Sequence, residues 1–500
     1  MATVQQSAAA AVAAFSSLLG VMTALINQRV PDSYMDEIFH VPQAQQYCTG
    51  VFDQWDSKLT TPPGLYLVSL GLHKLWIAFL QTPISGCSVL QLRSVNAAFG
   101  IATLPVIFNL IPLIHPARNQ SFTFNAIEAF VISLFPISFF FHLLYYTDSG
   151  STFFVLFSYY LSLRDKLFFC ALTGFISIWF RQTNVIWVAF IAATICIRHL
   201  QSIDSTTALD CPGYKLKSCG HLIKIISQFI GRLTLNIPSV FILLWPFIVV
   251  IQLFAAFVYI NGSVVLGDKT NHTAGFHIPQ LYYFCGFSAF FGFFAVNIPQ
   301  AILNFPGALS RSFKSLTIFS LVWIVAPAIM FETVRRFTIE HPFLLADNRH
   351  FTFYIWKNIF RQYAEARYVL IPVYMFCAWA IVRQLAKTQS VLWIVAYIGS
   401  VMLTLIPSPL LEFRYFTIPF ILLRLHLATY YRSESTSGKR TTKTGFPGWG
   451  WALALALECT LFVGINVSVL YLFLEKPFEW PTPTDGSNSI GHFTKMRFMW

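Results

Sequence analysis

The chain has 500 residues, of which 56% are hydrophobic and only 11% are charged, and its net charge is +12. Soluble domains carry about 25% charged residues, so the composition excludes a water-soluble globular protein. The Lys and Arg residues lie in short segments between apolar runs, which is typical of membrane-protein loops, and no nucleic-acid-binding motif accompanies them. These properties predict an all-α integral membrane protein, a polytopic bundle of about 12–14 transmembrane helices forming one domain over residues 1–500.

The predicted spans are apolar runs, and a full crossing needs about 20 residues. In chain order they are 7–26, 64–80, 90–114, 124–146, 151–163, 167–180, 183–197, 237–260, 282–304, 316–331, 369–387, 391–407, 415–431 and 451–473. The three runs between 151 and 197 are short, and one interpretation is that they are half-helices buried in the bundle. No Lys or Arg precedes the first run, so it is expected to be an uncleaved span rather than a signal peptide.

Basic residues predict which loops face the cytosol. Loops 198–235 and 432–449 are rich in Lys and Arg and are expected there. The first large loop, 27–63, and loop 332–368 are then expected on the opposite side of the membrane. Seven crossings before residue 198 contradict this assignment, so one run within 64–197 is expected not to cross, and the sequence leaves open which one.

The first loop contains two predicted helical segments. Pro31 and Ser33 predict a turn and a helix N-cap. Pro42 predicts the start of a second short helix that ends near Gly50, because proline is favoured in the first turn of a helix.

The acidic motif of this loop is the first candidate for chemistry. Asp36 and His40 are four residues apart and share a helix face, whereas Glu37 points elsewhere. A partly desolvated carboxylate at a membrane boundary is suited to act as a general base. Helix capping by the acids is the alternative, and a metal site formed by Asp36, Glu37 and His40 is a less favoured one.

Further polar motifs interrupt or flank the apolar runs. Trp55 and Asp56 suit either sugar binding or interfacial anchoring, because Trp offers an apolar face and a polar edge. Asp148 separates two apolar runs, and Arg181 with Gln182 separates two others. An Arg between short spans is costly in lipid, so it is expected to face a cavity or an aqueous interface, with a simple turn as the alternative.

Two basic motifs follow later in the chain. Asp347, Arg349 and His350, with Trp356 after them, lie in loop 332–368, and Arg414 precedes the run at 415. Arg is suited to bidentate phosphate binding, although snorkelling or a Glu412–Arg414 ion pair would also explain these residues. Arg-bearing motifs and an acidic motif on one predicted face favour an enzyme with an anionic substrate.

Several of these segments together resemble one family. They are YMDEIFHVPQAQQYC (34–48), QWDSKLTTPPGLYL (54–67), YTDSGS (146–151), FRQTNVIW (180–187), LADNRHFTFYIWK (345–357) and EFRYFTIPF (412–420). They are similar to motifs of the dolichyl-phosphate-glucose-dependent α-1,2-glucosyltransferases of the endoplasmic reticulum. The resemblance covers about residues 10–475, while loop 198–235 and the residues after 475 carry no recognised motif.

The resemblance implies a GT-C glycosyltransferase fold in the endoplasmic reticulum membrane, with the active site facing the lumen. It implies transfer of glucose from dolichyl phosphate glucose to the diglucosylated lipid-linked oligosaccharide, the last step of precursor assembly for N-glycosylation. These two lipids and the surrounding membrane are the expected partners, with no nucleic acid, no metal and no other cofactor; a protein partner is left open. The implied catalytic acids are Asp36 and Glu37, and the candidate substrate-binding residues are His40, Trp55, Asp56, Asp148, Arg181, Gln182, Asp347, Arg349, His350, Trp356 and Arg414.

The implied β-linked donor and α-linked product correspond to one inversion by direct displacement. Asp36 is the predicted base, with Glu37 and Asp148 as alternatives, and Arg349, His350 or Arg414 would stabilise the leaving phosphate. Competing functions are a transporter or channel, a related lipid-phosphate-sugar mannosyltransferase, and a non-catalytic membrane scaffold. A transporter would have charges in mid-span and duplicated halves, whereas here the charged motifs cluster at span ends and in loops and no duplicated half is visible.

Overall fold

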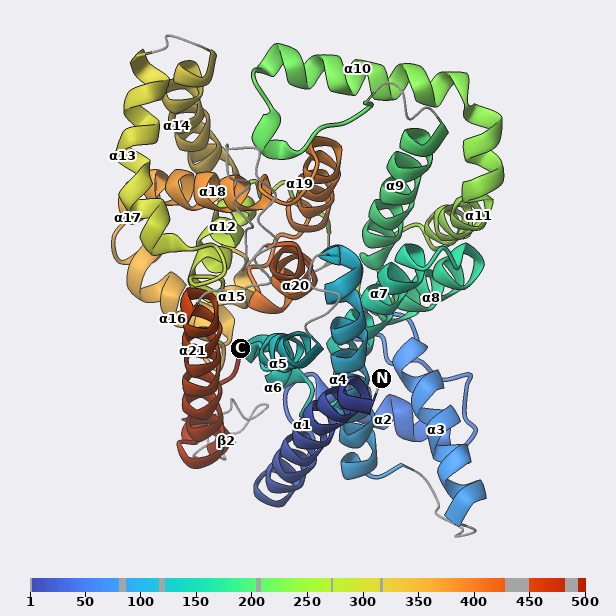
Figure 1. Cartoon of the computed structure of the whole chain (residues 1–500). Coiled ribbons are helices and arrows are strands. Elements are labelled where there is room, and N and C mark those ends of the chain that lie inside the picture. Colours follow the sequence, from blue (N-terminus) through green and yellow to red (C-terminus); the bar gives the residue numbers. More distant parts are fainter. Residues whose placement is uncertain are drawn as a thin grey trace.

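The computed structural model describes residues 2–80, 87–116, 122–203, 208–270, 273–314, 318–427, 449–481 and 493–500. Helices dominate this part of the chain (Figure 1). The α-helices are α1 (Ala2–Arg29), α2 (Glu37–Cys48), α3 (Gly64–Leu80), α4 (Val89–Ile114), α5 (Phe122–Ser133), α6 (Pro136–Phe141), α7 (Thr147–Leu163), α8 (Leu167–Phe180), α9 (Asn184–Ile203), α10 (Cys219–Leu235), α11 (Ile237–Asn261), α12 (Pro279–Phe291), α13 (Ile298–Lys314), α14 (Ile318–Phe337), α15 (Pro342–Ala346), α16 (Phe351–Ile355), α17 (Ala366–Val369), α18 (Ile371–Leu385), α19 (Val391–Leu405), α20 (Thr417–His426) and α21 (Trp449–Glu475).

Short elements complete the described chain. They are the 3-10 helices η2 (Gly213–Lys215) and η4 (Phe413–Phe416), the π-helix η3 (Trp356–Arg361) and the strands β1 (Phe478–Pro481) and β2 (Phe493–Met496). The two strands pair antiparallel, with Phe478 opposite Met496.

The length and apolar composition of several helices confirm the predicted class, an all-α membrane protein. Six helical segments of the described chain are long and apolar enough to cross a bilayer: Gln6–Arg29, Val89–Ile114, Asn184–Ile203, Ile237–Asn261, Ala366–Leu385 and Gly450–Glu475. Shorter apolar helices accompany them, so the protein is an all-α polytopic membrane protein. The total of about 12–14 crossings stays a prediction.

Two predicted spans are broken in the structure. Run 124–146 forms α5 and then α6, and the break falls before Pro136, which has no N–H for the helical ladder. Run 282–304 forms α12 and α13, with Asn297 between them at a φ of 58°, outside the helical region. The expected loop 198–235 contains helix α10, and most of loop 432–449 lies outside the described residues.

Helix α2 differs from the two segments expected in the first loop. It is continuous from Glu37 to Cys48 with Pro42 inside it, and Asp36 rather than Ser33 occupies the N-cap position. Met35 has a φ of 57°, so the chain turns sharply into this helix one residue before Asp36. Pro42 removes a single backbone hydrogen bond, which the tertiary packing of α2 tolerates.

Helix α3 packs against α2 and α8. Its first residue, Gly64, lies against the end of α8, where an added Cβ would be 2.5 Å from the carbonyl oxygen of Trp179. A disulfide between Cys48 and Cys87 holds the start of α4 beside the end of α2. That one run within 64–197 does not cross the membrane stays a prediction.

Helix α4 occupies the centre of the N-terminal half, where it contacts α1, α5 and α7 (Figure 1). Helices α7 and α8 form a tight antiparallel pair, and α9 packs against α19 and α11. Helix α10 lies across the top of Figure 1, far from α2. This arrangement brings the first loop, the α6–α7 turn, the α8–α9 turn, the loop before α16 and η4 together on one face of the bundle.

Candidate active site

Glu37 and Arg93 form a fully buried ion pair beside the site. Both side chains are 0% exposed, and the guanidinium donates from Nε to Oε1 at 2.9 Å and from Nη2 to Oε2 at 2.6 Å. The same carboxylate accepts the backbone N–H groups of Tyr34 and Tyr145 at 3.0 and 2.7 Å. Because each oxygen already accepts two hydrogen bonds, Glu37 is a structural residue that fixes α2 to α4 and to the α6–α7 turn.

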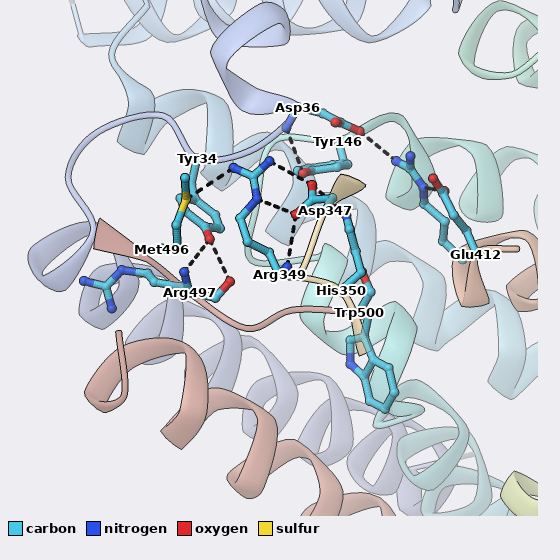
Figure 2. A network of polar contacts seen from close by, with 11 residues as sticks. Tyr34, Asp36, Tyr146, Asp347, Arg349, His350, Glu412, Met496, Arg497 and Trp500 are labelled. Atoms are coloured by element: carbon cyan, nitrogen blue, oxygen red, sulfur yellow. Dashed lines mark hydrogen bonds and ion pairs between the residues drawn. The ribbon is translucent and has the colours of Figure 1, made fainter. Parts of the chain in front are cut away.

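The Asp36 carboxylate does not join this pair and extends toward the segment that carries Glu412 (Figure 2). Its side chain is 37% exposed, and one carboxylate oxygen accepts from Nη1 of Arg414 at 3.0 Å. The backbone N–H of Asp36 donates to the Tyr146 hydroxyl at 3.1 Å, which fixes the residue in place. Burial alone would raise the pKa of Asp36, but the positive charge of Arg414, with His40 and His350, outweighs it and lowers the pKa.

Arg414 connects Asp36 to two further acidic residues. Its Nε pairs with Glu412, and its Nη1 lies 4.0 Å from Asp148. Asp148 stands in the first turn of α7, 8% exposed, and forms an ion pair with Arg181 from the α8–α9 turn. Arg181 lies over the ring of Tyr415, 5.1 Å from its centroid, so cations and carboxylates alternate across this part of the site.

A third basic group enters from the loop before α16. Arg349 donates two hydrogen bonds to Asp347, from Nε to Oδ1 at 2.7 Å and from Nη2 to Oδ2 at 2.8 Å. His350 Nε2 lies 3.8 Å from the same carboxylate. Figure 2 shows these residues, Asp36 and Tyr146 in one network, so residues from both halves of the chain share the site.

A cavity of about 660 Å³ opens next to these residues. Asp148, Arg181, Gln182 and Arg414 line its polar part. The amide of Gln182 donates to the Thr60 carbonyl at 2.7 Å, which ties the α8–α9 turn to the first loop. The apolar part is lined by side chains of α9, α11 and α19 and of the loop after α19, among them Ile186, Trp187, Phe254, Leu403 and Pro407.

Three other candidates from the first loop are not among the residues that line this cavity. The imidazole of His40 is buried and bonded through Nδ1 to the Tyr66 hydroxyl at 2.6 Å, and burial lowers its pKa to about 4. Asp56 accepts from the backbone N–H of Lys58 at 2.9 Å within a turn. Trp55 donates to the Leu59 carbonyl at 3.3 Å and packs on Tyr66, so these two residues shape the loop.

The geometry does not meet one expectation and does not support one of the less favoured alternatives. Trp356 is 1% exposed and its indole donates to Glu340 at 2.7 Å, so its ring is packed in the core and is not presented to a sugar. Glu37 turns away from Asp36 and His40, so these three do not converge on a metal. Within the described ranges, no three His, Cys, Asp or Glu side chains cluster in a way that would hold a metal ion.

The structure adds residues that sequence reasoning missed. Arg93 lies in an apolar run, and the only signal for it in the sequence is that an Arg inside a membrane span is rare. Tyr146 binds the Asp36 backbone, and Glu412 pairs with Arg414, as one sequence alternative proposed. The segment 493–500, for which no motif was recognised, also reaches the network (Figure 2).

Comparison with known proteins places these residues in a family. The model of the DIE2/ALG10 family matches residues 30–425. The chain belongs to the DIE2/ALG10 family. All residues predicted for the site lie inside the matched range, whereas segment 493–500 lies beyond it.

Members of the DIE2/ALG10 family from several kingdoms are similar to the chain over most of its length. A rat protein is 38% identical over 407 residues, 79% of this chain and 84% of its own length. An Arabidopsis thaliana protein is 36% identical over 481 residues, 85% of this chain and 92% of its own. Each is named Dol-P-Glc:Glc(2)Man(9)GlcNAc(2)-PP-Dol alpha-1,2-glucosyltransferase. No solved structure matches the chain.

Proposed function

We propose that the protein is an inverting glucosyltransferase that uses dolichyl phosphate glucose as donor. Its acceptor is the dolichol-linked oligosaccharide that already carries two glucoses, and the new linkage is α-1,2. The names of the relatives supply the reaction and the acceptor. The observation that carries the proposal is the Asp36 carboxylate, accessible and held by Arg414 beside a cavity that is polar at one end and apolar at the other.

Asp36 acts as the general base. The acceptor 2-hydroxyl oxygen attacks C1 of the donor glucose, the bond from C1 to the phosphate oxygen breaks, and the hydroxyl proton passes to Asp36. Glu37 is a poor candidate because its two oxygens are saturated by Arg93 and backbone N–H groups. Asp148 has one buried oxygen for which the described residues provide no hydrogen-bond partner, which suits binding of a sugar hydroxyl.

Arg414 and Arg181 stabilise the leaving dolichyl phosphate, which gains a negative charge as the bond breaks. Both guanidiniums line the cavity, whereas Arg349 is held bidentately by Asp347 outside it. When the donor phosphate shares Arg414 with Asp36, its negative charge raises the pKa of Asp36. The carboxylate then becomes a stronger base only after the donor has bound.

The apolar part of the cavity holds the first units of the dolichyl chain. Its lining from α9, α11 and α19 continues from Arg181 and Arg414 toward apolar side chains such as Ile186 and Phe254. A lipid phosphate requires a basic surface next to an apolar one, because its head is anionic and its tail needs a hydrocarbon environment.

The protein resides in the endoplasmic reticulum membrane, with the site facing the lumen. The disulfide between Cys48 and Cys87 lies on the face of the site, and disulfides persist in oxidising compartments. The basic segment around α10 lies on the opposite face, as the distribution of Lys and Arg in cytosolic loops requires.

The test is glucosyl transfer from dolichyl phosphate glucose to the diglucosylated lipid-linked oligosaccharide by purified protein. We expect Asp36→Asn to lower kcat by about 10²–10⁴-fold, the contribution of a positioned general base. Asp32→Asn is the matched control, because Asp32 is exposed in the same loop, and it should retain activity. Equal activity of the wild type and a folded Asp36→Asn variant would contradict the assignment of the base, and an inactive wild type would contradict the function.

A further inference from the structure

Residues 497–500 leave strand β2 and run into the polar network of the site (Figure 2). This short segment, called the tail segment here, contacts three parts of the chain that are far apart in sequence. These parts carry Asp36, the pair Arg349–His350, and Arg414.

The first contact is with the loop that carries Asp36. The Tyr34 hydroxyl donates to the Arg497 carbonyl at 2.7 Å and accepts from the Arg497 backbone N–H at 2.6 Å. Burial raises the pKa of Tyr34 to about 12, so the hydroxyl keeps its proton and makes both bonds. The Arg497 side chain donates to the Phe473 and Leu474 carbonyls at 2.6 and 2.9 Å, which anchors the segment to the end of α21.

The second contact is with the loop that carries Arg349 and His350. The Met499 N–H donates to the Arg349 carbonyl at 2.9 Å, and the Phe351 N–H donates to the Met499 carbonyl at 3.2 Å. His350 Nδ1 is hydrogen-bonded to the Trp500 carbonyl. A carbonyl oxygen only accepts, so Nδ1 carries a proton and the Trp500 main chain sets both the tautomer and the direction of the ring.

The third contact is with the segment that carries Arg414. The indole of Trp500 packs edge-on against Phe413, with ring centroids 6.0 Å apart, and also against Phe351 at 5.2 Å. Phe413 is the neighbour of Arg414 in η4, so one indole joins the Arg414 segment to the His350 segment.

We propose that the tail segment holds the loop of Arg349 and His350 beside the loop of Asp36 and beside η4, and thereby keeps Arg414 in position to bind the phosphate of the donor lipid. The proposal rests on the proposed function, because it takes a lipid monophosphate as the ligand. Arg349 and His350 lie in the loop between α15 and α16. The tail segment is bonded to this loop and to Tyr34, and it packs against Phe413. Loss of the tail segment would therefore let this loop open locally without unfolding the bundle.

The test is a kinetic comparison of Trp500→Ala, Trp500→Phe and Tyr34→Phe with the wild type, in the full-length protein. Donor and acceptor are varied separately, and binding of dolichyl phosphate is measured in parallel. We expect Trp500→Ala and Tyr34→Phe to raise KM for the donor about tenfold, the scale of one or two hydrogen bonds, with KM for the acceptor unchanged. Trp500→Phe should restore KM to within about twofold, because it keeps an aromatic contact with Phe413.

Trp451→Ala is the matched control. Trp451 is a buried indole on α21 that packs on Phe124 and does not reach the site. Substitution of a purely structural residue lowers the folded fraction, and hence the apparent kcat, but leaves both KM values unchanged. We expect this pattern for the control. The proposal is overturned when folded Tyr34→Phe and Trp500→Ala bind dolichyl phosphate and donor as the wild type does. An inactive wild type overturns the proposed function alone. The role of the tail segment is then still tested by comparing dolichyl phosphate binding between the wild type and the variants.

Discussion

At the scale of single residues, neighbouring acids in one motif have opposite roles. Asp36 and Glu37 are adjacent in sequence, yet one is 37% exposed and the other is 0% exposed. The difference follows from the helical geometry, because consecutive residues are about 100° apart around a helix and only one of them faces Arg93. The charge of Glu37 is neutralised in the protein interior, whereas Asp36 keeps a carboxylate at the surface of the site.

The pH dependence of transfer should report the Asp36–Arg414 pair. Arg414 keeps the pKa of Asp36 below its ordinary value of 3.8, so Asp36 stays ionised as the pH falls and kcat/KM should not decline on its account above about pH 5. Arg414→Gln removes the cation but leaves the burial, so the pKa rises and the acid-side decline should move to higher pH. The measurement is kcat/KM between about pH 4.5 and 8 for both proteins.

Arg335→Gln serves as the control for this profile, because Arg335 is exposed and pairs with Glu332 on α14. It should leave the acid-side decline where it is in the wild type. Coinciding acid limbs for the wild type and Arg414→Gln would mean that Arg414 does not set the pKa of the catalytic acid.

At the scale of elements, α2 is held in place by covalent and ionic links in addition to its apolar contacts with α3. The disulfide from Cys48 to Cys87 and the ion pair from Glu37 to Arg93 attach the two ends of α2 to the start of α4. An isolated helix of this length is marginal in water, so tertiary contacts have to stabilise it. The direction of the Asp36 carboxylate therefore depends on α4.

Glu37→Gln should destabilise the protein strongly. The amide keeps the shape of the side chain but leaves the buried charge of Arg93 unpaired, which costs about 3–5 kcal/mol of unfolding free energy. Glu475→Gln is the matched control, because the Arg29–Glu475 pair is about half exposed and contributes at most about 1 kcal/mol. Thermal unfolding in detergent measures both, and equal melting temperatures for the two variants would contradict the structural role of Glu37.

At the scale of the whole molecule, α21 is attached to the bundle by charge. Arg424 on α20 donates to Glu458 on α21 at 2.7 Å and to Glu128 on α5 at 2.9 Å, and all three side chains are at most 3% exposed. Three such charges in the interior of a membrane bundle are stable only together. Because Arg497 donates to the Phe473 and Leu474 carbonyls at the end of α21, this cluster contributes to the position of residues 497–500.

The cluster predicts an order of stability. Arg424→Gln removes the cation that pairs with both buried carboxylates and should lower the melting temperature more than Glu458→Gln, after which Arg424 still pairs with Glu128. The measurement is thermal unfolding of purified protein in detergent. Ser468→Ala, on an exposed face of the same helix, is the control and should have little effect. The reverse order of the two charge variants would show that Glu128 does not hold Arg424.

The sequence by itself determined the class of the protein, most of its helices and the motifs that carry its chemistry. Apolar runs are local signals, because a bilayer requires satisfied backbone groups over about 20 residues and so dictates helices. The resemblance carried by motifs such as 34–48 and 345–357 led to the family that the comparisons show. These inferences need no knowledge of how distant segments pack.

Only the tertiary structure decided what each polar residue contacts. Whether Glu37 is a base or a structural acid depends on Arg93, which lies 56 positions away, and the orientation of Arg414 depends on Asp36, 378 positions away. The place of the start of α4 beside the end of α2 follows from the disulfide at Cys87, and the place of Trp500 beside His350 follows from the docking of α21. Charge pairing and chain reach are set by distances in space, and hydrophobic periodicity along the chain carries no information about them.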